Sequence, residues 1–289
     1  MILEPDDWLR RQAHHEAEVD LRTSAHLERR QHHTKHPVYD FLFEYYPVRP
    51  AHLRRWHPGV EDSLHDPDGL APHPQWRNYM RNGDFVSVDL AEFWFRRGSS
   101  LTYMRDLMAT SATNAAQFDC FGLHEWAMVY QGRDIRHDLP LRLSPEDTDE
   151  VVRSHRLKCT HFDAYRFFTP PARPLNLTVL TREDQPQRDQ PGCVHATMDL
   201  YKWAAKLGPL VPGELFLETF DLALDARILD MEASPYDCRA LGFGAVCIET
   251  PEGKAEYVRR QRALAERAEP LRARLVALVD AARNATLTG

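Results

Sequence analysis

Apolar residues recur at helical spacing along most of the chain, and the clearest run lies between residues 38 and 46. That run is apolar nearly all round, which is typical of a buried helix, and Pro47 ends it. The first 33 residues are charged with sparse apolar positions, which predicts one or two surface helices that begin near Pro5. The same spacing predicts further helices over residues 90–112, 122–132, 194–207, 213–232 and 252–284.

Strand patterns are few in this sequence. FVSVDL (85–90) alternates like a short strand, and LKCTHFDAYRFF (157–168) is the strongest strand candidate. Stretches rich in proline and polar residues at 61–83 and 170–192 predict loops. Ser144, which a proline follows, predicts the N-cap of another helix.

These elements predict a mainly α fold with a small β element (α+β). The 289 residues form one globular domain in this interpretation, and the loop at 170–192 does not separate independent domains. Residues 1–35 are expected to form a peripheral helical segment at the N-terminus, and residues 252–289 a C-terminal helix. Hydrophobic residues make up 43% of the chain, which is enough to build the core of such a fold.

The composition bears on where the protein is located and on which partners it binds. No apolar run approaches the roughly 18 residues that a membrane-spanning helix needs, so we expect no membrane contact. The start of the chain lacks the pattern of a signal peptide, which predicts a cytoplasmic protein. The five scattered cysteines predict reduced thiols that are either buried or used as ligands. The net charge of −7 weighs against a broad phosphate-binding surface, so nucleic-acid binding is expected to be weak.

Three segments share one composition, in which a cysteine is followed by a histidine, a carboxylate and aromatic residues. Because all three repeat this order, we expect at least two of their histidines to face one common cavity. The alternative interpretation places each histidine in the core, bonded to a backbone carbonyl, with each cysteine as a small core residue. The segments are CFGLHEWAMVY (120–130), CTHFDAYRFF (159–168) and CVHATMDLYKW (193–203).

The histidines of these segments are candidate metal ligands. Neutral imidazoles bind zinc or iron, which makes His124, His161 and His195 a possible ligand set for a divalent metal. The sequence contains no CxxC pair and no HExxH motif, so no established zinc pattern supports this set.

The carboxylates of the same segments are candidate catalytic groups. Glu125, Asp163 and Asp199 could each act in acid–base chemistry. Asp199 follows His195 by one helical turn, so it could hold that ring in one tautomer. His195 lies in the first turn of the expected helix, where the macrodipole favours the neutral imidazole. The sequence therefore predicts His195 as a catalytic residue as well as a ligand.

A second candidate site combines aromatic and cationic residues around positions 36–59. Such a mixture suits a planar anionic ligand, through stacking and bidentate contacts. The alternative is helix packing with solvated arginines. The segment LDMEASPYD (229–237) adds three carboxylates, Asp230, Glu232 and Asp237, of which one could face a site, although capping is the simpler role. Candidate substrate-binding residues are Tyr45, Arg54, Trp56, Arg166, Tyr201, Lys202 and Trp203.

Several enzyme classes contain a characteristic sequence motif that this chain lacks. The sequence contains no GxGxxG, no GxxxxGK[ST] and no GxSxG. Their absence argues against a Rossmann enzyme, a P-loop NTPase and an α/β-hydrolase.

Six motifs of the chain carry a resemblance to a known family. They are HPVYDFLFEYYPVRPAHLRRWHPG, CFGLHEWAMVY, HFDAYRFFT, QPGCVHATMDLYKWAAKLGPL, LDMEASPYD and IETPEGKAEYVRRQ. With these motifs the chain resembles a bacterial family, common in actinobacteria, that carries the name 3-methyladenine DNA glycosylase. The resemblance covers about residues 8 to 275 and is specific in its motifs. It implies cleavage of the N-glycosidic bond of a modified base, with Glu125, Asp163 or Asp199 as the carboxylate.

Three hypotheses about function follow from the sequence. The first is an enzyme that cleaves the N-glycosidic bond of a base in a nucleoside or nucleic acid, as the resemblance implies. The second is a hydrolase or oxygenase that uses a His- and carboxylate-bound metal on a small molecule. The third is a non-catalytic protein that binds a planar anionic ligand through residues 36–59.

Overall fold

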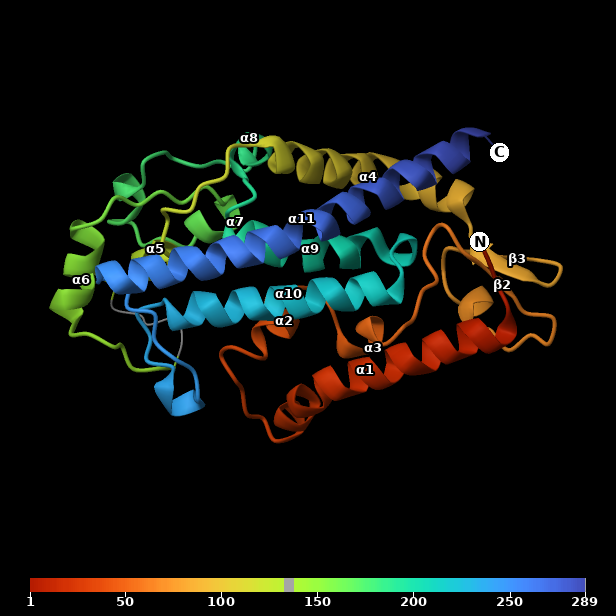
Figure 1. Cartoon of the computed structure of the whole chain (residues 1–289), viewed down its shortest axis with the longest axis horizontal. Helices are drawn as coiled ribbons and strands as arrows, with labels where there is room; N and C mark the ends of the chain where they lie inside the picture. Colours follow the sequence, from red (N-terminus) through yellow and green to blue (C-terminus); the bar gives the residue numbers. More distant parts are fainter. Residues whose placement is uncertain (133–137, 289) are drawn as a thin grey trace. The chain divides into compact units, whose positions relative to one another are not determined.

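Helices carry most of the chain, and the strands belong to one small sheet (Figure 1). The computed structural model describes residues 1–132 and 138–288. It confirms the predicted mainly α class with a small β element. The long helices are α1 (Pro5–Gln31), α4 (Leu90–Thr113), α9 (Val194–Leu207), α10 (Gly213–Glu232) and α11 (Pro251–Thr288).

Two compact units make up the chain, and each combines stretches that are distant in sequence. The first unit contains Met1–Ala109, Leu200–Asp221 and Leu271–Gly289. The second unit contains Thr110–Asp199 and Leu222–Pro270. The helices α4, α9, α10 and α11 each contribute residues to both units.

The sheet lies in the first unit, with the strand order β1-β2-β4-β3. β1 (Ile2–Leu3) pairs in parallel with β2 (Ser63–His65), and β4 (Phe85–Val88) is antiparallel to β2 and to β3 (Tyr79–Asn82). The strand predicted at 85–90 is confirmed as β4. β2 and β3 arise inside the segment predicted to be a loop, where their short length leaves too few residues for a clear alternation.

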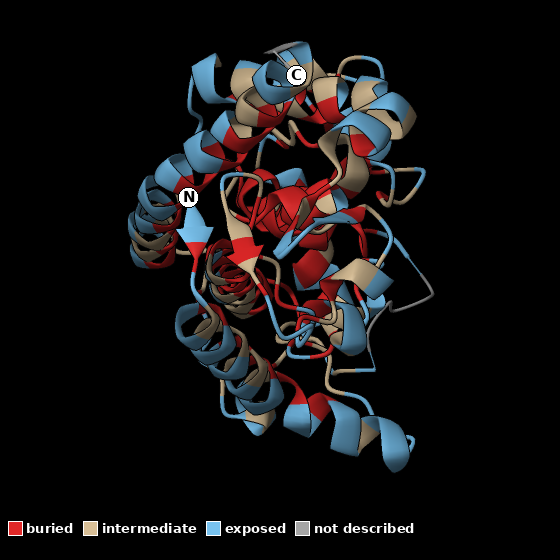
Figure 2. Cartoon of the chain, turned by 90° about the vertical axis from the view of Figure 1, so that its right-hand side faces the viewer, coloured by how far each residue is buried: buried red, intermediate tan, exposed pale blue. Residues whose placement is uncertain are grey.

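The N-terminal helix α1 presents a buried stripe to the rest of the first unit. Trp8, His15 and Val19 are buried on this stripe. Figure 2 shows the same division in other helices, with buried residues inward and exposed residues outward. Arg22 on the same helix forms an ion pair at 2.8 Å with Asp221, and this contact fastens α1 to α10 within the unit.

The buried helix predicted over residues 38–46 is shorter in the structure. Only α2 (Phe41–Glu44) is helical there, and α3 (Pro50–Leu53) follows as a second short helix. The prediction of burial holds for Leu42, which is fully enclosed. Pro47 and Pro50 lack the backbone N–H that a continuous helix requires, so the segment breaks into short turns.

Short helices and turns build most of the second unit. The strand predicted at 157–168 is wrong, because Phe162–Tyr165 forms the short helix α7. The buried residues His161, Ala164, Tyr165 and Phe168 follow helical spacing, which explains why the strand interpretation failed. The other short elements of this unit are α5 (Leu123–Ala127), α6 (Pro145–Arg153) and α8 (Gln185–Arg188), with 3₁₀ turns at Arg173–Leu175 and Arg239–Leu241. The first unit has 3₁₀ turns at His73–Gln75 and Gly208–Leu210.

The predicted cap of α6 is confirmed, because the Ser144 side chain accepts a hydrogen bond from the backbone N–H of Asp147.

The helices α10 and α11 run antiparallel, which Figure 1 shows directly. None of the described helices combines the length and hydrophobicity needed to cross a membrane. The ion pairs that join α10 to α11 are Glu218–Arg274, Asp225–Arg267 and Glu232–Arg260.

Candidate metal centre

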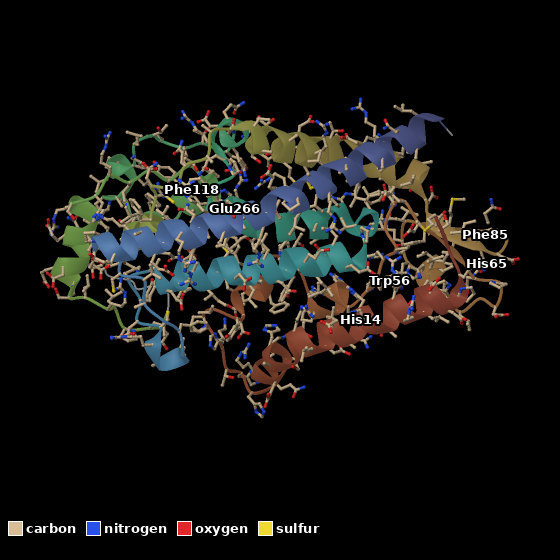
Figure 3. All side chains as sticks on the ribbon, in the orientation of Figure 1. His14, Trp56, His65, Phe85, Phe118 and Glu266 are labelled. Carbon is tan, nitrogen blue, oxygen red and sulfur yellow. The ribbon has the colours of Figure 1, made fainter. Side chains whose placement is uncertain are left out.

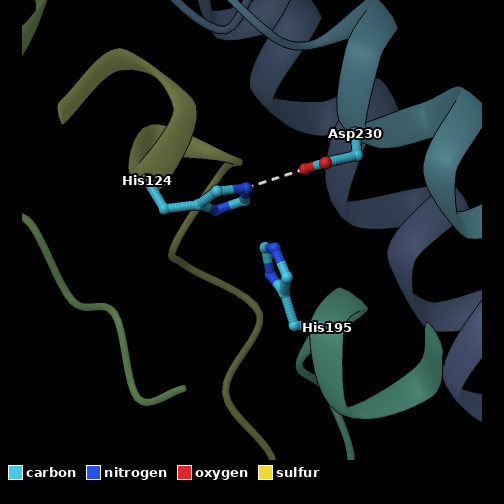
Figure 4. A group of neighbouring side chains, drawn as sticks. All are labelled: His124, His195 and Asp230. Atoms are coloured by element: carbon cyan, nitrogen blue, oxygen red, sulfur yellow. Dashed lines mark hydrogen bonds and ion pairs between the residues drawn. The ribbon is translucent and has the colours of Figure 1, made fainter. Parts of the chain in front are cut away.

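Two histidines and an aspartate meet in the second unit, each from a different helix (Figure 4). His124 lies on α5, His195 lies in the first turn of α9, and Asp230 lies near the end of α10. The Nε2 atom of His124 is 2.7 Å from Oδ1 of Asp230. One potential ligand atom from each residue lies within 4.8 Å of the others. The 2.7 Å contact is a hydrogen bond, which bonds to a metal ion held by both residues would replace.

A left-handed turn places His124 at this point. Gly122 has a φ of 70°, a conformation that favours glycine. A Cβ atom at this position would come within 3.2 Å of the Tyr257 ring. The chain enters α5 directly after this turn, and both His124 and Glu125 are buried as a result.

The third histidine, His161, lies next to this group. Its ring stacks on the ring of His195, with centres 5.4 Å apart and planes at 16°. The His124 ring meets His195 edge-on, with centres 4.3 Å apart. The structure thus brings all three predicted histidines together, with the His195 ring between the other two. This convergence agrees with the expectation that was based on the composition shared by their three segments.

Carboxylates hold His161 from two sides. Its Nδ1 atom lies 3.0 Å from Oδ1 of Asp189, and its Nε2 atom lies 3.7 Å from Oδ2 of Asp199. The sequence paired Asp199 with His195 instead. Helical spacing puts both side chains on one face of α9, but His195 joins His124 and Asp230 while Asp199 joins His161. The tertiary structure therefore corrects the partner of each.

A buried arginine ties two carboxylates of the centre together. Arg227 donates to Oε1 of Glu125 at 3.1 Å and to Oδ2 of Asp230 at 2.7 Å. All three side chains are buried. Burial opposes the charge on Asp230, but His124, His195 and Arg227 outweigh it and hold the pKa of this carboxyl well below its usual range. Asp230 is therefore ionised at neutral pH.

At His195 burial and the nearby groups favour the neutral form, whereas at Asp230 the nearby groups outweigh burial and favour the charged form. Burial, together with the nearby His124, lowers the pKa of His195 well below its ordinary value. The imidazole is therefore neutral at physiological pH, which is the form that coordinates a metal. The sequence predicted the same protonation state from the helix N-terminus.

A small cavity of about 20 Å³ adjoins the histidines. This volume has room for about one water molecule. His124 and His195 line it together with Tyr257 and the cysteines of all three repeated segments. Burial raises the pKa of the Cys159 thiol to about 12 and also raises the pKa values of the Cys120 and Cys193 thiols. These cysteines are protonated, free thiols that shape the cavity wall.

The remaining predicted carboxylates have arginine partners. Glu125 pairs with Arg227, as described above. Asp163 is partly exposed and forms ion pairs with Arg182 at 2.8 Å and with Arg166 at 3.3 Å. The Arg166 guanidinium also lies 4.3 Å from the centre of the Phe167 ring. These contacts place Arg166 and Asp163 in a local surface network.

Most of the predicted substrate-binding residues belong to the first unit, where they contact neighbouring side chains. Trp56, labelled in Figure 3, is fully buried, and the Arg11 guanidinium lies 5.3 Å from its ring centre. Arg54 forms ion pairs with Asp20 and Glu16 on α1. The other packing contacts are Tyr45 stacked on Phe41, Tyr201 fully buried against Phe216, and Lys202 over the ring of Trp203.

Sequence reasoning missed two residues of the centre and underrated a third. Asp189 follows α8 in a segment predicted to be a polar loop, and Arg227 lies inside α10 with no local motif around it. Asp230 was assigned a capping role in preference to a site. Pairs such as Asp230 with His124 are 106 residues apart, so only the folded chain reveals them.

Comparison with known proteins adds no relative to this geometry. No protein-family model matches the chain, no curated protein matches its sequence and no solved structure matches its fold. The resemblance to the glycosylase family therefore stays a prediction, and the arguments about function depend on the histidine and carboxylate cluster.

Proposed function

We propose that the protein is a metal-dependent enzyme acting on a small molecule, with the ion held by His124, His195 and Asp230. One observation carries this proposal: ligand atoms of two imidazoles and a carboxylate from three separate helices lie within 4.8 Å of one another. Two histidines and one carboxylate are a known ligand set for zinc in hydrolases and for iron in oxygenases.

The protonation states support a cation at this point. A ligating imidazole must be neutral and a ligating carboxylate must be ionised, and the pKa directions of His195 and Asp230 meet both conditions. Glu125 and Asp230 share the single guanidinium of Arg227, so two carboxyl groups meet one cationic side chain beside the proposed ion.

The cavity beside the histidines gives the ion an open side. Its volume of about 20 Å³ has room for about one water molecule beside the ion. A zinc ion there would lower the pKa of a bound water and favour hydrolysis. A ferrous ion with the same ligands would favour chemistry with oxygen. The identity of the bound metal thus decides between the two reaction classes.

N-glycosidic cleavage is a second candidate, and Glu125 favours it. The Oε2 atom of Glu125 is buried and has no hydrogen-bond partner among the described residues. Such an oxygen can accept a proton from an attacking water. Asp163 forms an ion pair with Arg182 at 2.8 Å and Asp199 lies 3.7 Å from His161, whereas Glu125 contacts Arg227 through Oε1 and leaves Oε2 for a water. Glu125 is therefore the carboxylate we assign to this reaction.

Metal analysis of the untagged purified protein tests the proposal. Elemental mass spectrometry should find a transition metal in the wild-type protein and little in His124→Asn or His195→Asn. His14→Asn is the matched control, because His14 is exposed on α1 and outside both metal groups (Figure 3). A wild-type protein that takes up no zinc or iron on reconstitution would exclude the metal-dependent function. Release of free base from a nucleoside by that metal-free protein would support the second candidate instead.

A further inference from the structure

We infer that a second divalent cation binds beside the first, held by His161 and Asp199 with Asp163 as a further ligand. This inference rests on the proposed function and deepens it, because it makes the centre dinuclear. Ligand atoms of these three residues lie within 4.8 Å of one another, and all three belong to the second unit.

The position of the His161 ring supplies the first argument. The ring lies between two carboxylates, with Nδ1 3.0 Å from Asp189 and Nε2 3.7 Å from Asp199. A histidine that a carboxylate holds through Nδ1 can present Nε2 to a metal ion, and the carboxylate of Asp199 lies on that same side of the ring.

The separation of these two atoms supplies the second argument. Nε2 of His161 and Oδ2 of Asp199 are 3.7 Å apart, which is too long for a good hydrogen bond. Metal bonds of 2.0–2.2 Å place two tetrahedral ligands about 3.4 Å apart. The observed distance is therefore close to that of two ligands on one ion.

A chain of hydrogen bonds fixes the orientation of His161. The side-chain amide of Gln185 donates to Oδ2 of Asp189 at 2.9 Å, and Oδ1 of the same carboxylate faces His161. Gln185, Asp189 and His161 are all buried. A carboxylate that holds the far nitrogen of a ligating histidine is a recurring feature of metal sites. Asp189 is thus a positioning residue for the second ion.

The contacts of Asp163 determine the affinity that we expect for the second ion. Arg182 and Arg166 already contact its carboxylate at 2.8 and 3.3 Å, and they compete with a cation for it. The second ion should therefore bind more weakly than the first. The stacked rings of His161 and His195, with centres 5.4 Å apart, keep the two groups adjacent.

Titration of the apoprotein with Co²⁺ alone tests the inference without any variant. The visible absorption of Co²⁺ with nitrogen and oxygen ligands should rise in two stages and saturate at about two ions per chain. Saturation at about one ion would overturn the second site and leave the proposed function intact. No uptake at all would overturn both.

Variants then locate the two ions. His161→Asn should abolish the weaker stage and keep the stronger one, whereas His124→Asn should remove the stronger stage. Asp189→Asn should weaken the second ion about 10–100-fold, as loss of an orienting partner does, without changing the first. A second stage that persists unchanged in His161→Asn would place the extra ion elsewhere and overturn the assignment. If His161→Asn does not fold, Asp163→Asn replaces it, and its second stage should weaken by about tenfold or more.

Discussion

Replacing Asp230 with asparagine should separate the stability that comes from metal from the stability that comes from packing. Asparagine has nearly the same shape as aspartate but lacks the charge that a metal ion requires. In the wild-type protein this carboxylate contacts His124 at 2.7 Å through one oxygen and Arg227 at 2.7 Å through the other. Asp230→Asn should therefore keep the fold and lose the ion.

The magnitude follows from mass action. A ligand present at about 100 times its Kd adds about 2.7 kcal/mol to the free energy of unfolding. For a chain of this size, each kcal/mol raises Tm by roughly 2–4 °C. The wild-type protein should therefore melt about 5–10 °C higher with saturating Zn²⁺ than with EDTA.

In EDTA, where no metal is bound, the Tm of Asp230→Asn measures only the effect of losing the buried ion pair. Breaking such a pair by removing one partner destabilises a protein by about 3–5 kcal/mol. Glu125 stays on Arg227 and limits the loss, so we expect the lower end, a Tm about 6–12 °C below the wild type. Addition of Zn²⁺ should then raise the Tm of Asp230→Asn by no more than about 1 °C, because a site without its carboxylate stays largely empty.

Circular dichroism melts in EDTA and in Zn²⁺ measure both effects. Asp225→Asn is the control, because Asp225 lies on the same helix and forms a half-exposed ion pair with Arg267. Such surface pairs contribute about 0–1 kcal/mol, so this control should melt like the wild type and keep its gain from zinc. An equal zinc gain in Asp230→Asn and in the wild type would refute the assignment of Asp230 as a ligand.

Three further outcomes are expected. Burial lowers the pKa of His73 to about 4, so as pH falls below about 6.5 the unfolded chain takes up a proton that the folded chain refuses. Stability should then decrease by about 1.4 kcal/mol per pH unit until about pH 4, and urea titrations of His73→Gln should show a shallower pH slope than those of the wild type. The Cys159 thiol, whose pKa burial raises to about 12, should react with a thiol reagent at pH 8 about a thousandfold more slowly in the folded than in the unfolded chain. Equal rates would mean that the cavity wall opens. Duplex DNA should bind weakly and with strong salt dependence, and tight binding at physiological salt with a slope of about six phosphates or more would contradict the argument from net charge.

The long helices were predictable because their signals are local. α4, α9 and α10 begin and end within a residue or two of the ranges that hydrophobic spacing and capping predict. The error at 157–168 has a local cause as well, since β-like composition concealed a buried stripe of helical spacing. The division of the chain into two units has no such local signal, because each unit gathers segments that are far apart in sequence.

The histidines of the candidate site could be predicted from the sequence, but the carboxylates that contact them could not. The repeated composition around His124, His161 and His195 is visible in the sequence, and the structure brings these rings together. The partners come from contacts across the fold: Asp230 is 106 residues from His124, and Asp189 is 28 residues from His161. No spacing rule connects such pairs, so the sequence predicts that the histidines converge but not which carboxylates they contact.

The exchange of partners on α9 connects the two candidate metal groups. His195 and Asp199 are one turn apart on this helix, and each belongs to a different group. A rotation or shift of the first turn of α9 would misplace one ligand of each group at the same time. The two groups are therefore mechanically linked through one rigid element, and occupancy of the first should organise the second. Fraying of the first turn of α9 would remove His195 from its group and would loosen the position of Asp199 beside His161 at the same time.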